Sequence, residues 1–185
     1  MKKRFLQLLT AVAFMMLIFS FSVFAGDGIT DASEKRYDAA IAYLNEFYIK
    51  KNPEAALTVY QGSYKDKQML KKAAKRITKG AKNDEQRAKK IFNWVSKNVS
   101  YNNVYSSLSA DVYKNRKTQC YGYANLTRDL LRYAGVPAVT ATGWRIDLSS
   151  VEKESELCRL TEINEIEPHA WNMVYLNGKW EFVDA

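Results

Sequence analysis

Three side chains of this sequence could together form an activated nucleophile, namely those of Cys120, His169 and Asp184. A thiolate attacks a carbonyl carbon, an imidazole moves protons, and a carboxylate orients the imidazole. His169 is the only histidine in the chain, so the proton-transfer role has one candidate. These residue types predict nucleophilic catalysis at a carbonyl group, provided that the fold brings them together.

Cys120 stands at the predicted start of a helix over residues 121–134, which Gly135 ends. A helix N-terminus carries about half a positive charge, which stabilises a thiolate. Its free N–H groups can hold the oxyanion of a tetrahedral intermediate. Gly122 would allow close approach of a substrate or of another backbone segment. A lone cysteine at a helix start is, however, usually a small core residue.

His169 and Asp184 flank a predicted β-hairpin. Residues 170–176 and 179–184 alternate in polarity, and Asn177-Gly178 between them predicts a two-residue turn of type I′. The register that follows pairs Leu176 with Lys179, Tyr175 with Trp180, Met173 with Phe182, and Trp171 with Asp184.

Strand alternation places His169 and Asp184 on the same face of this hairpin. As diagonal neighbours they are about 7–8 Å apart along the backbone, a gap that the two side chains can close to a hydrogen bond. That face is otherwise apolar and is expected to face the core. The opposite face is expected to be wetter, since it carries Asn172, Lys179 and Glu181.

The elements before Cys120 are predicted to be helical. Residues 33–50 and 66–79 show apolar stripes, the second of them within a strongly basic segment. A short helix follows Pro53. Asn83 or Asp84 caps a further helix that ends near Asn98, with apolar residues at i, i+3, i+4, i+7 and i+11 from Ala88. A helical turn over 109–113 leads to Cys120, and residues 136–142 alternate as a strand.

The first 25 residues have the pattern of a signal peptide. Lys2, Lys3 and Arg4 precede an apolar run over residues 5–24, and Ala25 ends a small-residue cleavage pattern before Gly26. An uncleaved anchor is the alternative, because the run is long enough to span a bilayer. Either outcome predicts a secreted or cell-surface protein. If the segment is cleaved, contact with the membrane is transient and made only through this segment. Residues 26–82 then form a helical region, and residues 83–185 form the catalytic core.

Charge is distributed unevenly along the exported part. Residues 26–119 hold 19 basic and 10 acidic side chains, whereas residues 120–185 hold 6 basic and 10 acidic ones. The basic helices could favour an anionic cell-surface polymer as a partner. An ordinary solvated surface is the plainer interpretation. The acidic stretch over residues 147–167 is expected near the mouth of the active site, where it would attract cationic groups.

Two cysteines in an exported chain first suggest a disulfide. A bridge between Cys120 and Cys158 would block the cysteine that has the catalytic setting, so Cys158 is expected to be a bystander or a site of redox inactivation. One histidine and two cysteines without C-x-x-C spacing do not make a zinc site. The acidic stretch also lacks the spacing of a calcium loop. No metal, cofactor or nucleic acid is expected.

Several sequence blocks, in this order, resemble the transglutaminase-like superfamily, which has a papain-like catalytic core. The blocks are residues 85–95, 99–101, 110–113, 120–126, 131–137, 169–172 and 180–184. The resemblance is to an exported bacterial member. It implies an α+β fold in which the nucleophile's helix packs on an antiparallel sheet, with a helical region before it. Carried over residue by residue, it makes Cys120 the nucleophile, His169 the general base and acid, and Asp184 the orienting carboxylate.

Two departures from the family pattern concern the site. The family often has glycine where this chain has Thr118. It also commonly continues past the aspartate, whereas this sequence ends at Ala185, one residue after Asp184.

The resemblance implies acyl transfer at an amide through a thioester on Cys120, with a protein or peptide as substrate. An amine acceptor gives cross-linking, and water gives a peptidase, amidase or deamidase. A non-catalytic scaffold or binding domain at the cell surface is the third alternative, and the three filled catalytic positions count against it.

Overall fold

The computed structural model describes residues 38–102, 106–146 and 166–184. The chain divides into two compact units. One unit comprises residues 46–142 and 170–185 and is called the core unit below. The other comprises residues 1–45 and 143–169, of which 38–45, 143–146 and 166–169 are described. No helix in these described ranges is both long and apolar enough to cross a membrane.

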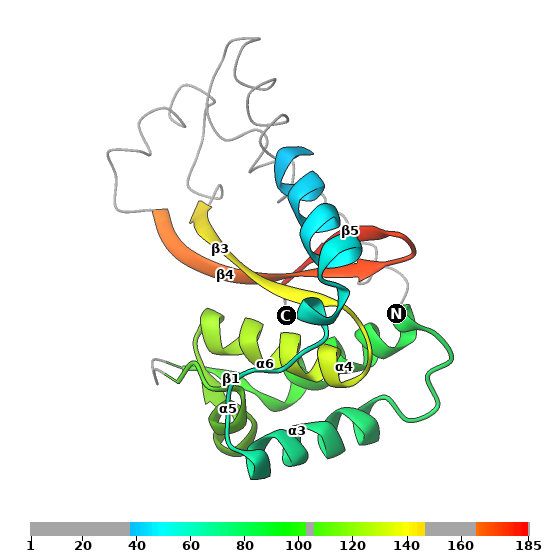
Figure 1. The fold of residues 1–185 in the computed structure, drawn as a ribbon. Coiled ribbons are helices and arrows are strands. Elements are labelled where there is room, and N and C mark those ends of the chain that lie inside the picture. Colours follow the sequence, from blue (N-terminus) through cyan, green and yellow to red (C-terminus); the bar gives the residue numbers. More distant parts are fainter. Residues whose placement is uncertain (1–37, 103–105, 147–165, 185) are drawn as a thin grey trace, which may run out of the picture. The chain divides into compact units, whose positions relative to one another are not determined.

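Helices make up most of the core unit (Figure 1). They begin with the π-helical turns η1 (Asn45–Lys51), which a short 3-10 helix, η2 (Pro53–Ala56), follows. Residues 38–44, which belong to the other unit, form the helix that leads into η1. The remaining helices are α3 (Tyr64–Ile77), α4 (Asp84–Asn98), α5 (Ser109–Asn115) and α6 (Cys120–Tyr133).

Five strands accompany these helices within the described ranges. The strands β1 (Ser100–Tyr101) and β2 (Lys117–Thr118) form a short parallel pair. The strands β3 (Ala138–Ile146), β4 (Ile166–Leu176) and β5 (Lys179–Val183) form a sheet in the order β3-β4-β5, in which β4 and β5 are antiparallel. This mixture of helices with an antiparallel sheet confirms the predicted α+β class.

Local sequence signals explain where the helices begin and end. Ser63 accepts a hydrogen bond from the backbone N–H of Asp66 at the start of α3, and Asn83 accepts one from that of Gln86 at the start of α4. Of the two predicted caps, Asn83 and Asp84, the structure has Asn83. Helix α6 ends just before Gly135, whose φ of +82° favours glycine because other residues rarely adopt it.

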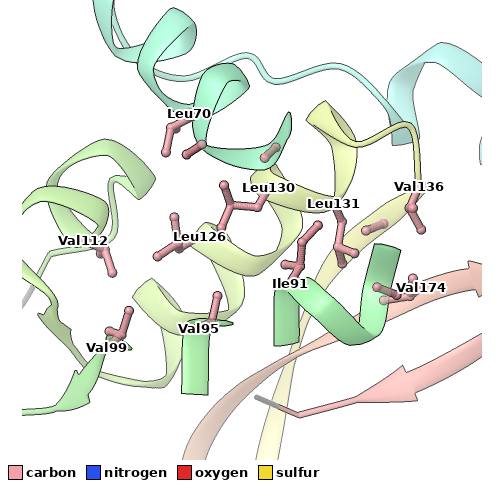
Figure 2. Close-up of a cluster of buried hydrophobic side chains, with 14 of the residues drawn as sticks. Leu70, Ile91, Val95, Val99, Val112, Leu126, Leu130, Leu131, Val136 and Val174 are labelled. Atoms are coloured by element: carbon pink, nitrogen blue, oxygen red, sulfur yellow. The ribbon is translucent and has the colours of Figure 1, made fainter. Parts of the chain in front are cut away.

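The hydrophobic core lies between the helices and the sheet (Figure 2). Leu126, Leu130 and Leu131 of α6 are fully buried, as is Ile91 of α4. Val174 of β4 is also fully buried and belongs to the same cluster. Burying a leucine or isoleucine side chain stabilises a fold by roughly 1.5–3 kcal/mol, so α6 contributes a large share of the stability.

The C-terminal hairpin has the predicted register and turn. The pairs Met173–Phe182, Tyr175–Trp180 and Leu176–Lys179 are all observed. Asn177 and Gly178 have φ values of +52° and +85°, as a type I′ turn requires.

The predicted wet face of this hairpin is wrong at Asn172, whereas Lys179, on the same face near the turn, is 71% exposed as expected. Asn172 is only 1% exposed, and its amide nitrogen donates to the carbonyl oxygens of Ala124 at 2.9 Å and Val139 at 3.4 Å. Together with Val174 it packs against α6, so this face meets the core at its end away from the turn. The prediction failed at this residue because it assumed that a polar amide would be exposed to solvent. The amide of Asn172 instead donates hydrogen bonds to buried backbone carbonyls.

The aromatic face of the hairpin is covered as well. Trp180 is 4% exposed, and its ring lies 6.3 Å from that of Tyr48 in η1. Trp171 and Phe182 pack against each other with ring centroids 5.4 Å apart. The hairpin therefore lies between the α6 side of the core and η1.

Some expectations concern residues outside the described ranges. These are the signal segment over residues 1–25, Cys158, and residues 147–165 of the acidic stretch. They stay predictions.

Replacing Asn172 by alanine should lower the free energy of unfolding by about 1–3 kcal/mol, because two backbone carbonyls would lose a buried donor. Urea unfolding followed by circular dichroism measures the change. Lys179→Ala, at a side chain that is 71% exposed in an ion pair with Glu181, is the matched control and should change stability by less than about 1 kcal/mol. Equal effects of the two substitutions would contradict the buried role of Asn172.

Candidate active site

Cys120 is the first residue of α6, half-buried, with a free thiol. Gln119 precedes it in an extended conformation, and its side chain makes no capping hydrogen bond. The first turn of α6 also contains no acidic residue. The positive end of the helix is therefore not offset by a carboxylate in its own first turn, which favours negative charge on a thiolate or an oxyanion there.

Strand pairing fixes the chain just before Cys120. The backbone N–H of Ser100 donates to the carbonyl oxygen of Arg116, and that of Asn102 donates to Thr118, both at 2.9 Å. These bonds attach β2 to the segment that leaves α4. Cys120 lies two residues after the end of β2 and is the first residue of α6. Strand pairing therefore restrains the backbone before Cys120, and the helix restrains the backbone after it.

Arg116 turns the chain from α5 into β2. Its φ of +59° lies in the left-handed region, which residues other than glycine rarely adopt. Its guanidinium lies 4.4 Å from the ring centroid of Trp94 and 4.2 Å from that of Tyr113. Such cation–π contacts help to hold an uncommon backbone conformation in place.

Gly122 lets the first turn of α6 approach the preceding segment closely. A Cβ atom at this position would lie 1.9 Å from Oγ1 of Thr118 and 2.4 Å from the carbonyl oxygen of Ser106. These two atoms are themselves joined, because Thr118 donates to Ser106 at 2.8 Å. Of the two uses considered for Gly122, the structure shows close approach of another backbone segment.

Little empty space remains at this contact. The cavity beside Gly122 has a volume of about 10 Å³, enough for about one water molecule. It is lined by Ser106, Ser107, Thr118, Gln119, Tyr121 and Gly122. This cavity is too small for a substrate. The start of α6 is therefore closely packed against the segment before it.

A buried polar network lies further along α6. Asp129 accepts hydrogen bonds from Ser109 at 2.6 Å and from the adjacent Arg128 at 2.7 Å. Arg128 also donates to Asn125 at 2.9 Å, and Asn125 donates to the carbonyl oxygen of Ser107 at 3.0 Å. The network links α6 to α5 and to the loop before it. Sequence patterns did not indicate it, because Ser107 and Ser109 lie 18 and 20 residues from their partners in α6.

Arg132 connects the end of α6 to two other segments. Its guanidinium donates to the carbonyl oxygens of Ala138 at 2.8 Å and Thr58 at 2.7 Å. Burial, and then repulsion from Arg128, lowers the pKa of Arg132 to about 10. It remains charged at neutral pH, and both acceptors are backbone groups.

His169 and Asp184 lie on the elements that the sequence predicted for them. His169 is a half-buried residue of β4, and Asp184 is half-buried and directly follows β5. Continuing the observed register one step beyond the Asn172–Val183 pair places Asp184 opposite Trp171. Cys120 and Asp184 belong to the core unit, and His169 is the last residue of the other unit. Their joint action stays a prediction.

Thr118 and Ser106 are site residues that the sequence did not indicate. In the sequence, Thr118 differs from the glycine that the family often has at this position. In the structure it is fully buried and lies against Gly122 at the start of α6. A threonine alone carries no signal for such a role. As for metals, no group of three or more histidine, cysteine or carboxylate side chains within the described ranges has a suitable arrangement.

Comparison with known proteins identifies the family. Residues 71–185 match the sequence model of the transglutaminase-like superfamily, which covers more than half of the chain. The protein therefore belongs to the transglutaminase-like superfamily.

Two curated relatives are similar in sequence. The chain is 26% identical over 136 residues to the human (Homo sapiens) kyphoscoliosis peptidase, covering 70% of this chain and 20% of that protein. It is 30% identical over 112 residues to the mouse (Mus musculus) kyphoscoliosis peptidase, covering 57% of this chain and 16% of that protein. The match thus spans about a fifth or less of these relatives.

Solved structures share the fold. A candidate cysteine protease from Cytophaga hutchinsonii superimposes with a TM-score of 0.57 at 22% identity, covering 74% of this chain and 42% of that one. The periplasmic domain of TgpA from Pseudomonas aeruginosa gives a TM-score of 0.50 at 15% identity, covering 70% and 44%. At these identities the likeness concerns the fold, and it agrees with a papain-like core.

Gly122→Ala should lower the free energy of unfolding by about 1–3 kcal/mol or more, because the added methyl meets backbone as well as side chain. Chemical unfolding measures this loss. Gly80→Ala is the control: its Cβ would meet nothing within 4 Å, so only the positive φ of +78° opposes it, at about 1–2 kcal/mol. A Gly122→Ala protein as stable as the wild type would show that the helix start is not closely packed.

Proposed function

We propose that this protein catalyses acyl transfer at an amide carbonyl of a protein or peptide, through a thioester on Cys120. The observation that carries this proposal is the position of Cys120 as the first residue of α6, with no carboxylate in that turn. Membership of the transglutaminase-like superfamily supports it. In this proposal His169 moves the protons and Asp184 orients the imidazole.

The reaction would proceed in two halves. The thiolate of Cys120 attacks the amide carbon, forming a C–S bond, and the resulting oxyanion faces the first N–H groups of α6. The C–N bond then breaks, and the leaving amine takes a proton from His169. An acceptor attacks the thioester while His169 removes its proton, and cleavage of the C–S bond restores the thiolate.

The acceptor defines two candidate activities. An amine acceptor, as in a transglutaminase, gives cross-linking and is the first candidate. Water, as in a cysteine peptidase or amidase, is the second. The second is supported by the names of two similar proteins, a kyphoscoliosis peptidase and a candidate cysteine protease. A non-catalytic scaffold would remain if Cys120 proved inert.

Cys120→Ala should abolish activity, and His169→Ala should lower kcat by at least about a hundredfold, because general acid–base catalysis contributes about 10²–10⁴. Asp184→Ala should reduce kcat less, since the nucleophile and base remain. Amine incorporation into a glutamine-bearing protein and ammonia or peptide release from it, measured in parallel, separate the two acceptors.

Cys158→Ser serves as the matched control and should retain activity. Iodoacetamide should modify Cys120 much faster than Cys158, as followed by mass spectrometry of the two single-cysteine variants. Equal alkylation rates together with full activity of Cys120→Ala would exclude a thiol mechanism. No activity in the wild-type protein, together with equal alkylation rates, would leave the non-catalytic scaffold.

We also propose that the enzyme acts outside the cytoplasm, because residues 1–25 have the pattern of a signal peptide. The mature protein from an expressing bacterium should begin at Gly26 when its N-terminus is sequenced. An N-terminus at Met1 in a membrane fraction would indicate an uncleaved anchor, and the same N-terminus in the cytosol would overturn export.

A further inference from the structure

A groove of about 530 Å³ lies between α3 and α5, within the core unit. It is lined by Tyr64, Lys65, Gln68, Met69, Lys72, Ala73, Arg76 and Tyr113. Its volume is in the range of sites that bind small ligands or peptide side chains. None of these residues belongs to the candidate active site, so the groove needs an explanation of its own.

The rim of the groove is cationic. Lys65, Lys72 and Arg76 are exposed, and no carboxylate is among the lining residues. Helical spacing sets the three cations in a row, about 10 Å and then about 6 Å apart along the axis. Asp66 is the only acidic residue of α3, and its carboxylate lies 2.7 Å from the ammonium group of Lys114.

Because Asp66 is paired with Lys114, no carboxylate of α3 is left to neutralise the positive charge of the groove rim. The hydrogen bond from Lys114, and then the one from Ser63, lowers the pKa of Asp66, so its carboxylate stays ionised and paired with α5. The cations on the groove side therefore have no acidic partner on their own helix. An incoming anion would not have to displace one.

Apolar and aromatic side chains also line the groove. They are Met69, Ala73, Tyr64 and Tyr113. Tyr113 is held in place, because Arg76 donates to its hydroxyl at 2.8 Å. Its ring also stacks on that of Trp94, with centroids 5.5 Å apart. A wall that is already ordered loses little conformational entropy when a ligand binds.

We propose that this groove binds an acidic peptide segment that carries an apolar or aromatic side chain. Its carboxylates would pair with the three cations of the rim, and its apolar side chain would pack against Met69 and the tyrosine rings. The apolar and aromatic side chains of the lining favour a peptide over a phosphate polymer, which has no apolar side chain to place there. That the segment belongs to the substrate rests on the proposed function.

Two variants on the same helix give a matched test. Lys65→Gln/Lys72→Gln removes two charges from the groove, and Lys71→Gln/Lys75→Gln removes two exposed charges of α3 that do not line it. The probe is a fluorescein-labelled peptide of glutamates around one phenylalanine, and anisotropy at low salt measures its Kd. Each protein also carries Cys120→Ala, so that binding is measured without turnover.

The groove variant should weaken binding about tenfold, and the control variant less than about twofold. Replacing the phenylalanine of the peptide by serine should also weaken binding to the protein with all lysines intact. Equal losses in both lysine variants would mean diffuse attraction and overturn the groove. Inorganic polyphosphate binding as tightly as the peptide, with no effect of the phenylalanine, would assign the groove to a polyanion and overturn a peptide ligand.

The substrate role is tested separately by kinetics, on proteins in which Cys120 is intact. Fusing the same acidic peptide to a glutamine-bearing substrate should lower KM at least about threefold for the enzyme with wild-type lysines, with kcat unchanged, and not for the groove variant. Peptide binding with no change in KM would overturn the substrate role but not the binding site. Absence of any acyl transfer would count against the proposed function, while the binding data would still decide on the groove.

Discussion

The burial of helix α6 is the constraint on which the rest of the structure depends. Its leucines at 126, 130 and 131 are fully buried, and they share one cluster with residues of α3, α4, α5 and the sheet. Removing one buried leucine side chain typically costs about 2–5 kcal/mol, a large fraction of the stability of a domain of this size. The nucleophile candidate is therefore the first residue of the most constrained element of the core unit.

Polar groups inside this core restrict how α6 can be oriented. Asp129 is 1% exposed and would be costly to bury without its hydrogen bonds from Ser109 and Arg128. Asn172 of β4 is buried as well, and its amide needs the carbonyl oxygen of Ala124 in α6 as a hydrogen-bond acceptor. Hydrophobic burial alone would tolerate small rotations and shifts of the helix. The hydrogen bonds are directional and allow far fewer positions of α6. They thereby define where the first turn of α6 lies.

Much of this fold could be predicted from sequence because its signals are local. The Asn177-Gly178 turn fixes the hairpin register by itself, and the cap at Asn83 and the stop at Gly135 mark helix ends within a few residues of chain. The family resemblance depended on short blocks of the same kind. These features need no knowledge of distant partners.

What the sequence did not indicate depends on contacts between distant segments. Asn172 was expected in solvent, because an amide reveals nothing about carbonyls that lie 33 and 48 residues away. The contact of Thr118 and Ser106 with the first turn of α6 was hidden for the same reason. The α3 groove required the structure too, since Tyr113 joins its wall from another helix.

The contact at Gly122 has a consequence for how this sequence can diverge. Its missing side chain leaves room for the hydroxyl of Thr118 and the backbone carbonyl of Ser106, so the residues at positions 122 and 118 are not free to vary independently. A homologue with alanine at the position of Gly122 would need a smaller residue at that of Thr118 and a displaced backbone at that of Ser106. Substitutions at positions 118 and 122 should consequently covary across an alignment, as a steric signature of the segment that carries Cys120.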